Sequence, residues 1–370
     1  MISISRYLLV AFISSFLFMS CQPHGKLVAT WPGSEDLAHE NHAGRNRLFT
    51  GTAPRRKLLW SKKGAGRIEM LDLAHPEEGF RVVFERSVAP EGDRDGFVPV
   101  GLDVISDPEK SGRTLLYAAN AGVRRSGGGK VSVFEIGKDP LTGNAKLTLL
   151  WETPRSSLLP KINGLTVARD GTIYASNFGL SPFVRDAPQV GAAEGETKGR
   201  VNTVVCFRPK SAGGDGEWKI VARGLAGANG LALTPDERHL LVCSYHTKKV
   251  HAFNRDPATG ELLGLGPEAR SGLAFHPDNL KAAGNHEFTV AGQRNTFLVG
   301  LQLFFGLPVG AGGGERFRWE PGGESRQMTD YTPWLKTDRH APSTVIEIEG
   351  KIHVGHIVSP GVRVFDLPPR

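Results

Sequence analysis

The sequence predicts an all-β protein with the architecture of a closed β-propeller, on three observations. Short apolar runs alternate with small or polar residues at a period of two, tight turns join these runs, and one stretch recurs along the chain. A four-stranded meander cannot bury both of its faces alone, so repeated copies should stack radially around an axis. No long amphipathic helical pattern interrupts them. A β-sandwich is the structural alternative.

The clearest copy of the repeat runs from Asn229 to Phe253. Leu231 and Leu233 alternate with smaller residues, residues 234–237 form a turn, and two further apolar runs follow. Related copies share a polar or small residue at the start of an apolar strand, and they open near Pro99, Asn163, Asp278 and Ser343. The intervals between copies suit one four-stranded blade each, with loop insertions.

The composition indicates a globular protein with a large core. The chain has 370 residues, of which 39% are hydrophobic and 22% charged. The formal net charge is +7, but no dense Lys/Arg patch with interleaved aromatic residues is present. We therefore expect no nucleic-acid partner.

Residues 1–20 have the pattern of an export signal. Arg6 supplies a positive charge, and the apolar run from Tyr7 to Met19, 13 residues long, is too short to span a bilayer. Cys21 follows a small residue, which predicts a bacterial lipoprotein of the periplasm or cell envelope, anchored to the membrane through lipidated Cys21. Simple secretion is the alternative. Residues 21–32 are interpreted as a tether and residues 33–370 as one propeller domain.

Three other features of the sequence indicate structural roles. Cys206 and Cys243 lie in strand-like runs and are interpreted as small buried hydrophobic residues, with a disulfide as the alternative. The segment Ser181–Gly199 is interpreted as a long surface loop overhanging a site. The glycine-rich run Gly310–Gly314 lacks the Lys-Ser/Thr of a phosphate-binding loop, so a flexible hairpin tip is predicted.

The residues that indicate chemistry carry hard oxygen atoms. Four of them open predicted blades and one lies in an acidic N-terminal motif; they are Glu35, Asn163, Asn229, Asp278 and Asn279. In a radial arrangement the strand entrances converge at one end of the axis. Two carboxylates and three amide oxygens suit Ca²⁺, which takes about 6–8 oxygen ligands, whereas zinc prefers His and Cys. For any one of these residues the capping of a turn is the favoured interpretation, whereas three in register before equivalent strands favour a shared ion.

Several motifs in this order resemble the paraoxonase/arylesterase family of six-bladed propeller hydrolases and lactonases, whose wider relatives include gluconolactonases and strictosidine synthase-like proteins. The motifs are GSEDL at Gly33–Leu37, LLPKINGLTV at Leu158–Val167, ANGLALTPD at Ala228–Asp236, PDNL at Pro277–Leu280 and STVIEIEGKIHVG at Ser343–Gly355.

The resemblance implies a central calcium ion held by the same five residues, which binds the substrate carbonyl oxygen and stabilises the oxyanion. It also implies a second, weaker ion at Asp36 and the backbone carbonyl of Leu102, with Gly164 in place of the third ligand. As the base that assists a bound water we expect Asp278 first and Glu35 second.

The chain also departs from the family. Val100 and Ala121 stand where paraoxonases carry the two histidines of the proposed base dyad, and Gln293 aligns with a further pocket histidine. Phe365 stands where the family has a disulfide cysteine. The remaining histidines near the motifs are interpreted as packing or surface residues, with a place in the site wall as the alternative; they are His246, His276 and His356.

The expected function is calcium-dependent hydrolysis of lactones or aryl esters, with calcium polarising the carbonyl and a bound water attacking. The alternative is a non-catalytic, calcium-stabilised binding propeller at the cell envelope, because the histidine dyad is absent. A third hypothesis is a synthase-like protein whose pocket carboxylate acts without calcium. The sequence leaves the substrate and the oligomeric state open.

Overall fold

The computed structural model describes residues 25–368 except 43, 62–65, 87–95, 108–109, 111, 123–127, 140–142, 180–185, 193–200, 211–213 and 337. The predicted export signal and Cys21 therefore lie outside the described residues and stay predictions. No helix in the described ranges is long and apolar enough to cross a membrane.

The predicted propeller is confirmed, with six sheets as the family resemblance implied. Each sheet is antiparallel and its strands follow mainly in chain order from the axis outward. The first three blades comprise β2 (Asp36–His42), β3 (Arg45–Thr52), β4 (Gly66–Asp72) and β5 (Arg81–Arg86); β6 (Pro99–Ser106), β7 (Thr114–Asn120), β8 (Lys130–Lys138) and β9 (Ala145–Glu152); and β10 (Ile162–Val167), β11 (Ile173–Asn177), β13 (Thr203–Phe207), β14 (Trp218–Arg223) and β12 (Gln189–Val190).

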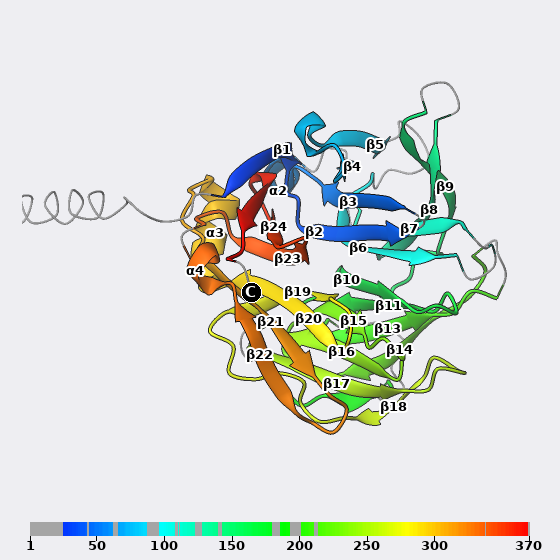
Figure 1. Cartoon of the computed structure of the whole chain (residues 1–370). Coiled ribbons are helices and arrows are strands. Elements are labelled where there is room, and N and C mark those ends of the chain that lie inside the picture. Colours follow the sequence, from blue (N-terminus) through cyan, green and yellow to red (C-terminus); the bar gives the residue numbers. More distant parts are fainter. Residues whose placement is uncertain are drawn as a thin grey trace, which may run out of the picture.

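The last three blades are built in the same way. They comprise β15 (Ala228–Leu233), β16 (His239–Ser244), β17 (Lys249–Arg255) and β18 (Leu262–Leu265); β19 (His276–Ala282), β20 (Glu287–Gln293), β21 (Gly312–Trp319) and β22 (Ser325–Asp330); and β23 (Pro342–Ile348), β24 (Lys351–His356), β25 (Pro360–Asp366) and β1 (Lys26–Pro32). The innermost strands β2, β6, β10, β15, β19 and β23 contact one another in turn and form a closed ring (Figure 1).

The predicted tether is wrong for residues 26–32. These residues form β1, which pairs with β25 in the register Lys26↔Val364 and Val28↔Val362. In Figure 1 the blue N-terminal strand lies beside the red C-terminal blade. The two ends of the chain therefore close the ring by completing one sheet. A partner more than 300 residues away leaves no local signal in the sequence.

We expect the propeller to lose at least about 2 kcal/mol of unfolding free energy when the chain begins at Gly33, because the backbone hydrogen bonds of β1 are lost and the edge of β25 is exposed. Chemical denaturation measures this. A chain that begins at Gly25 is the matched control and should keep full stability. Equal stability of the two truncated chains would show that β1 does not close the ring.

Apolar side chains fill the spaces between neighbouring blades. Phe84, Phe97 and Phe134 pack edge to face between the first two blades, with ring centroids 4.6–6.2 Å apart. Cys206 and Cys243 are free thiols, and Cys243 is fully buried. This confirms the interpretation of Cys243 as a small buried residue, whereas Cys206 is only partly buried and packs at the edge of a cluster. Phe365 is also buried, in the last blade.

The glycine-rich run was predicted wrongly as a hairpin tip. Gly312, Gly313 and Gly314 are buried at the start of β21 and pair with β20. A Cβ atom on Gly312 would lie 1.9 Å from Pro342, and one on Gly313 would lie 2.6 Å from Phe275. The glycines are therefore needed for close packing between blades.

The segment 181–199, predicted as a surface loop, contains regular structure, and a helix that was not predicted follows β20. The described part of the segment 181–199 includes β12, at the outer edge of the third blade, and the Asp186 side chain accepts hydrogen bonds from Ser244 and Thr247 of the fourth. The chain after β20 forms α3 (Thr296–Phe305), which Asn295 caps by accepting from two backbone N–H groups. The other helices in the described part of the chain are α2 (Arg55–Ser61), α4 (Thr332–Leu335) and the 3₁₀ turn η1 (Pro76–Glu78).

Candidate functional site: an oxygen-lined mouth of the central channel

The structure brings the five predicted site residues to one mouth of the channel. Glu35 directly precedes β2, Asn163 and Asn229 lie near the start of β10 and β15, and Asp278 and Asn279 lie near the start of β19. All except Asn163 are buried. The Asn279 Nδ2 donates to the Glu35 carbonyl oxygen at 3.1 Å, which ties the acidic N-terminal motif to the fifth blade.

The innermost strands are irregular at the level of the site. The pairing register shifts between Ile162 and Leu165, between Ala228 and Leu231, and between Pro277 and Leu280. Each shift encloses one or two of the predicted ligands. A bulge adds an unpaired residue and turns its side chain away from the regular alternation. The bulges thus explain how two consecutive residues, Asp278 and Asn279, both contribute to one site.

Glycines next to the two asparagines let neighbouring strands approach closely. A Cβ atom on Gly164 would lie 2.4 Å from the carbonyl oxygen of Asn229, and one on Gly230 would lie 2.5 Å from that of Asp278. These contacts place Asn163, Asn229 and Asp278 side by side around the axis. The Asn-Gly pairs that mark the repeat in the sequence are therefore required by the narrow channel.

Three oxygen atoms of the site have no hydrogen-bond donor among the described residues. They are the Oδ1 atoms of Asn163, Asn229 and Asp278, and each is buried. A buried oxygen without a donor costs about 1–3 kcal/mol, so a cation or ordered water at this place would satisfy three groups at once. Only two of the five residues are acids, and no three His, Cys, Asp or Glu side chains gather as a metal site in the described part of the chain. This donor set fits Ca²⁺ and does not fit zinc.

Asp278 is held in a fixed orientation by its neighbours. Gln293 Nε2 donates to Asp278 Oδ2 at 2.7 Å and to the Pro342 carbonyl at 2.8 Å, while Tyr245 donates its hydroxyl to Gln293 Oε1 at 2.7 Å. Gln293 stands where the family has a pocket histidine, and here it is fully buried and positions the carboxylate. The Asp278 Oδ1 atom is buried and has no hydrogen-bond partner among the described residues.

Burial and then the nearby charge of Glu35 raise the pKa of Asp278 to about 8, against the hydrogen bonds from Gln293 and Asn229. Ionising two neighbouring carboxylates is unfavourable when no cation lies between them. A divalent ion between them would lower the pKa of Asp278 again.

An unpredicted contact also reaches Glu35. The Arg55 guanidinium forms an ion pair with the Glu35 carboxylate and donates to the Pro99 carbonyl at 3.1 Å. Arg55 lies on α2, after the second strand of the first blade, and its position in the sequence gives no sign of this contact. A cation at the site would share Glu35 with Arg55.

The positions of the family's histidine dyad are apolar in space as well as in sequence. Val100 and Ala121 are each 6% exposed and pack in one hydrophobic cluster. The three other histidines each form a hydrogen bond within the protein. His246 forms one with the carbonyl oxygen of Gly179, and His276 forms one with the carbonyl oxygen of Tyr245. His356 forms one with the carboxylate of Asp338. This supports their interpretation as packing residues.

The second predicted ion position is occupied by a side chain. Lys281 Nζ donates to Asp36 Oδ2 at 2.8 Å and to the Leu102 carbonyl at 2.7 Å, the two groups that were expected to hold the ion. Asp36 is 2% exposed and also accepts from the backbone N–H groups of Leu37 and Leu102. These residues do not fit a second divalent ion while Lys281 is present.

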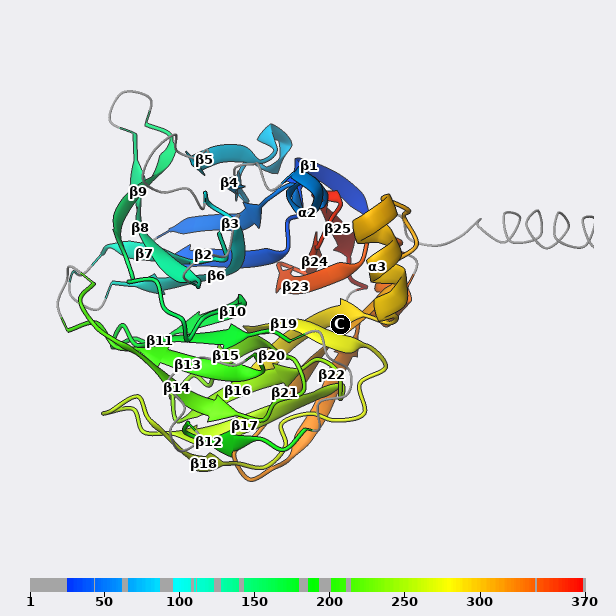
Figure 2. The same cartoon turned by 180° about the vertical axis from the view of Figure 1, so that it is seen from behind.

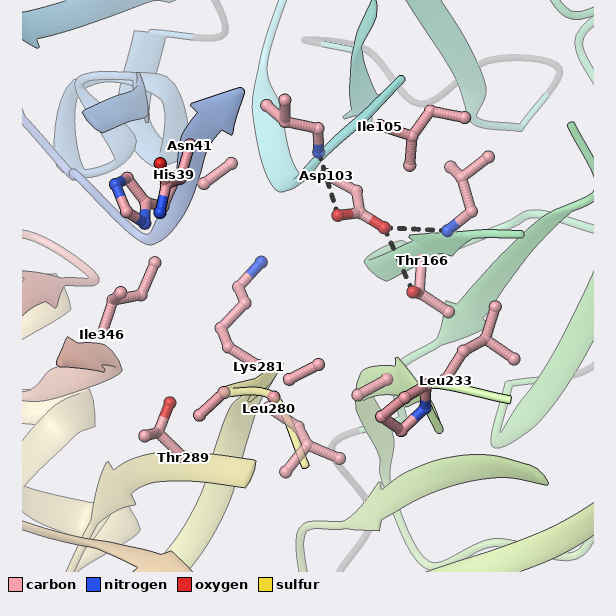
Figure 3. Close-up of a pocket in the computed structure, with 18 of the residues that line it drawn as sticks. His39, Asn41, Asp103, Ile105, Thr166, Leu233, Leu280, Lys281, Thr289 and Ile346 are labelled. Atoms are coloured by element: carbon pink, nitrogen blue, oxygen red, sulfur yellow. Dashed lines mark hydrogen bonds between the residues drawn. The ribbon is translucent and has the colours of Figure 1, made fainter. Parts of the chain in front are cut away.

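A cavity of about 930 Å³ lies between the inner strands, and Lys281 is one of its lining residues. All six innermost strands line it, and Figure 3 shows Lys281 extending from β19 toward its upper part, across from Asp103. Asp103 accepts hydrogen bonds from Thr166 and from the backbone N–H groups of Val104 and Val167. Burial raises the pKa of Asp103, and the Lys281 charge opposes this.

No protein-family model matches the chain. Serum paraoxonase/lactonase 3 of Rattus norvegicus is 22% identical over 240 residues, and this match covers 58% of the chain and 61% of the relative. Among solved structures, a luciferin-regenerating enzyme aligns over 93% of both chains with 12% identity and a TM-score of 0.49. A gluconolactonase from Xanthomonas campestris aligns over 94% of this chain and 99% of its own, with 16% identity and a TM-score of 0.44. Structural similarity at these identities concerns the fold and does not indicate the activity.

The fold and the site define a class, the six-bladed β-propellers with a polar site at the mouth of the central channel. Within this class, the ordered motifs and the match of 22% identity make the chain similar to a paraoxonase/lactonase, of whose length the match covers 61%.

Proposed function

We propose that this propeller is a calcium-dependent hydrolase of lactones or aryl esters. The observation that carries the proposal is the group of three buried oxygen atoms, on Asn163, Asn229 and Asp278, that lack donors at one mouth of the channel. The similarity to a paraoxonase/lactonase supports the reaction class.

The residues of the chain take distinct roles in this proposal. Glu35, Asn163, Asn229, Asp278 and Asn279 would hold the calcium ion, which supplies a Lewis acid for the ester carbonyl when bound. Asp278 Oδ1 accepts a proton from the attacking water and returns it to the leaving alcohol. Gln293 keeps the carboxylate in position for both transfers, since it fixes the other carboxylate oxygen.

The test is hydrolysis of a small panel of lactones and phenyl acetate, with calcium and with EDTA. We expect turnover that needs calcium and falls at least about a hundredfold in Glu35→Gln and Asn229→Ala. Glu77→Gln is the matched control, because the Glu77 side chain is 72% exposed on η1. Full turnover in Glu35→Gln together with loss of calcium binding would refute the proposal.

A second candidate function is a non-catalytic binding propeller stabilised by calcium. The buried, apolar Val100 and Ala121 favour it, because no histidine base stands at these positions. It predicts that calcium raises the melting temperature while no member of the panel is hydrolysed. Calcium-dependent turnover that disappears in Glu35→Ala would eliminate it.

A further inference from the structure

A second cavity lies beside the helices α2 and α3. It has a volume of about 610 Å³ and is lined by these two helices and by the connection between β24 and β25. Figure 2 shows α2 and α3 next to each other at one end of the propeller, and Trp60 of α2 contacts Phe304 of α3 with ring centroids 6.2 Å apart. None of the five residues predicted to hold calcium lines this cavity. Chemistry in it would therefore depend on other residues than those of the axial site.

The wall of this cavity contains a serine and a histidine in direct contact. Ser359 Oγ lies 2.7 Å from His340 Nδ1, and Gln302 Nε2 donates to the same oxygen at 3.0 Å. All three residues line the cavity. Ser359 Oγ forms no other hydrogen bond with the described residues, so His340 Nδ1 is the acceptor for its proton. A hydroxyl that donates to an imidazole is the arrangement in which a general base activates a nucleophile.

The imidazole of His340 is suited to accept this proton. Burial lowers the pKa of His340, and the charge of Asp338 opposes this, so the ring is neutral at neutral pH. The ring is also held in place, because it packs edge to face against His356 with ring centroids 5.9 Å apart. His356 in turn is fixed by the Asp338 carboxylate, which lies 2.6 Å from its Nε2 atom. The base therefore has both the protonation state and the fixed orientation that it needs.

The rest of the lining fits the other parts of an acyl transfer. Trp60, Pro54 and Pro308 supply apolar surface for a small acyl or aryl group. Arg56 lines the same cavity, and the end of α3 makes room for it: a Cβ atom on Gly306 would lie 2.5 Å from Arg56 Nη1. A guanidinium in this wall would stabilise the negative charge that develops on a carbonyl oxygen when a serine adds to its carbon.

We propose that Ser359 is a nucleophile that forms an acyl-enzyme with aryl esters of small carboxylic acids, with His340 as its base and without calcium. Ser359 Oγ forms a bond to the carbonyl carbon while its proton passes to His340 Nδ1. The bond from this carbon to the phenol oxygen then breaks, and the phenol leaves with the proton from His340. Water next attacks the acyl group and gives a proton to His340, and the acid leaves as Ser359 Oγ recovers that proton. This centre acts independently of the function proposed for the axial site.

The labelling test treats the full chain, in EDTA, with phenylmethylsulfonyl fluoride, which reacts with activated serines. We expect one labelled residue, Ser359, in mass spectra of the digested protein, and a labelling rate at least about a hundredfold lower in His340→Gln, because the base is lost. His75→Gln is the matched control, since the His75 side chain is 62% exposed, and it should react at the wild-type rate. No label on Ser359, or equal rates for wild type and a folded His340→Gln, would overturn the inference.

A kinetic test separates this inference from the proposed function. In EDTA, wild type should release 4-nitrophenol from 4-nitrophenyl acetate above the rate without protein, beginning with a stoichiometric burst that leaves an acetyl group on Ser359. Ser359→Ala, which removes only a hydroxyl, should abolish this release, and Ser325→Ala should keep it, because Ser325 is an exposed serine of β22. No release by wild type in EDTA, or equal release by Ser359→Ala, would overturn the nucleophile and leave the axial hydrolase intact. Release that needs Ser359, without any additional turnover on adding calcium, would uphold the nucleophile and remove the axial hydrolase.

Discussion

Replacing Asp278 by asparagine is expected to lower calcium-dependent turnover at least about a hundredfold, because the variant loses one of two site carboxylates and the proton acceptor together. Asparagine keeps the shape of the side chain and mimics the protonated form, so the fold should persist. Calorimetry should show strongly weakened calcium binding. The control is Asp366→Asn, since the Asp366 side chain is 86% exposed at the end of β25. Unchanged calcium affinity in Asp278→Asn would show that the ion is held elsewhere.

The same variant should change how the stability of the calcium-free protein depends on pH. The pKa of Asp278 is raised to about 8 by burial and by Glu35, whereas the unfolded chain has its ordinary value of 3.8. Between these values the folded state binds the extra proton, so unfolding free energy falls as pH rises from about 4 to 8. Asp278→Asn should remove most of this decline. Parallel curves for wild type and Asp278→Asn in EDTA would contradict the assignment.

The sequence predicts the strands of this fold well, because each inner strand carries its own local pattern of alternation and turn residues. The parts that it does not predict depend on contacts between distant segments. The strand β1 pairs only with β25, so Lys26–Pro32 looks like a tether when it is considered alone. The glycines from Gly312 to Gly314 are needed because Pro342 and Phe275 approach them. Neither requirement is visible in a local window.

The candidate site shows the same division. Four of the five oxygen-bearing residues could be predicted because they stand at the openings of repeats, and the fifth, Glu35, because it lies in a compact acidic motif. The groups that contact these residues could not be predicted. Arg55 forms an ion pair with Glu35 from a helix, and Gln293 donates a hydrogen bond to Asp278 from the next strand. Lys281 is the one such group with a sequence signal, since it follows the predicted ligand Asn279 by two residues on β19. Only the closure of the ring brings it to Asp36 and Leu102.

Replacing Lys281 by methionine is expected to destabilise the calcium-free protein by about 3–5 kcal/mol, because it leaves the buried carboxylate of Asp36 without its counter-charge. Lys281 joins three blades at the axis: it extends from β19 and contacts Asp36 of β2 and Leu102 of β6. Denaturation in EDTA measures the loss. Lys249→Met is the matched control, since Lys249 pairs with Glu268 near the surface, where the Lys249 side chain is 40% exposed, and should cost less than about 1 kcal/mol.

The number of bound ions should change with the same substitution. In wild type the Lys281 ammonium and an ion between Asp36 and Leu102 exclude each other, so we expect one calcium ion per chain. Lys281→Met frees the Asp36 Oδ2 atom and the Leu102 carbonyl, so added calcium should recover part of the lost stability in this variant beyond its effect on wild type. Two ions per wild-type chain, or equal gains from calcium in both proteins, would show that the lysine does not take the place of an ion.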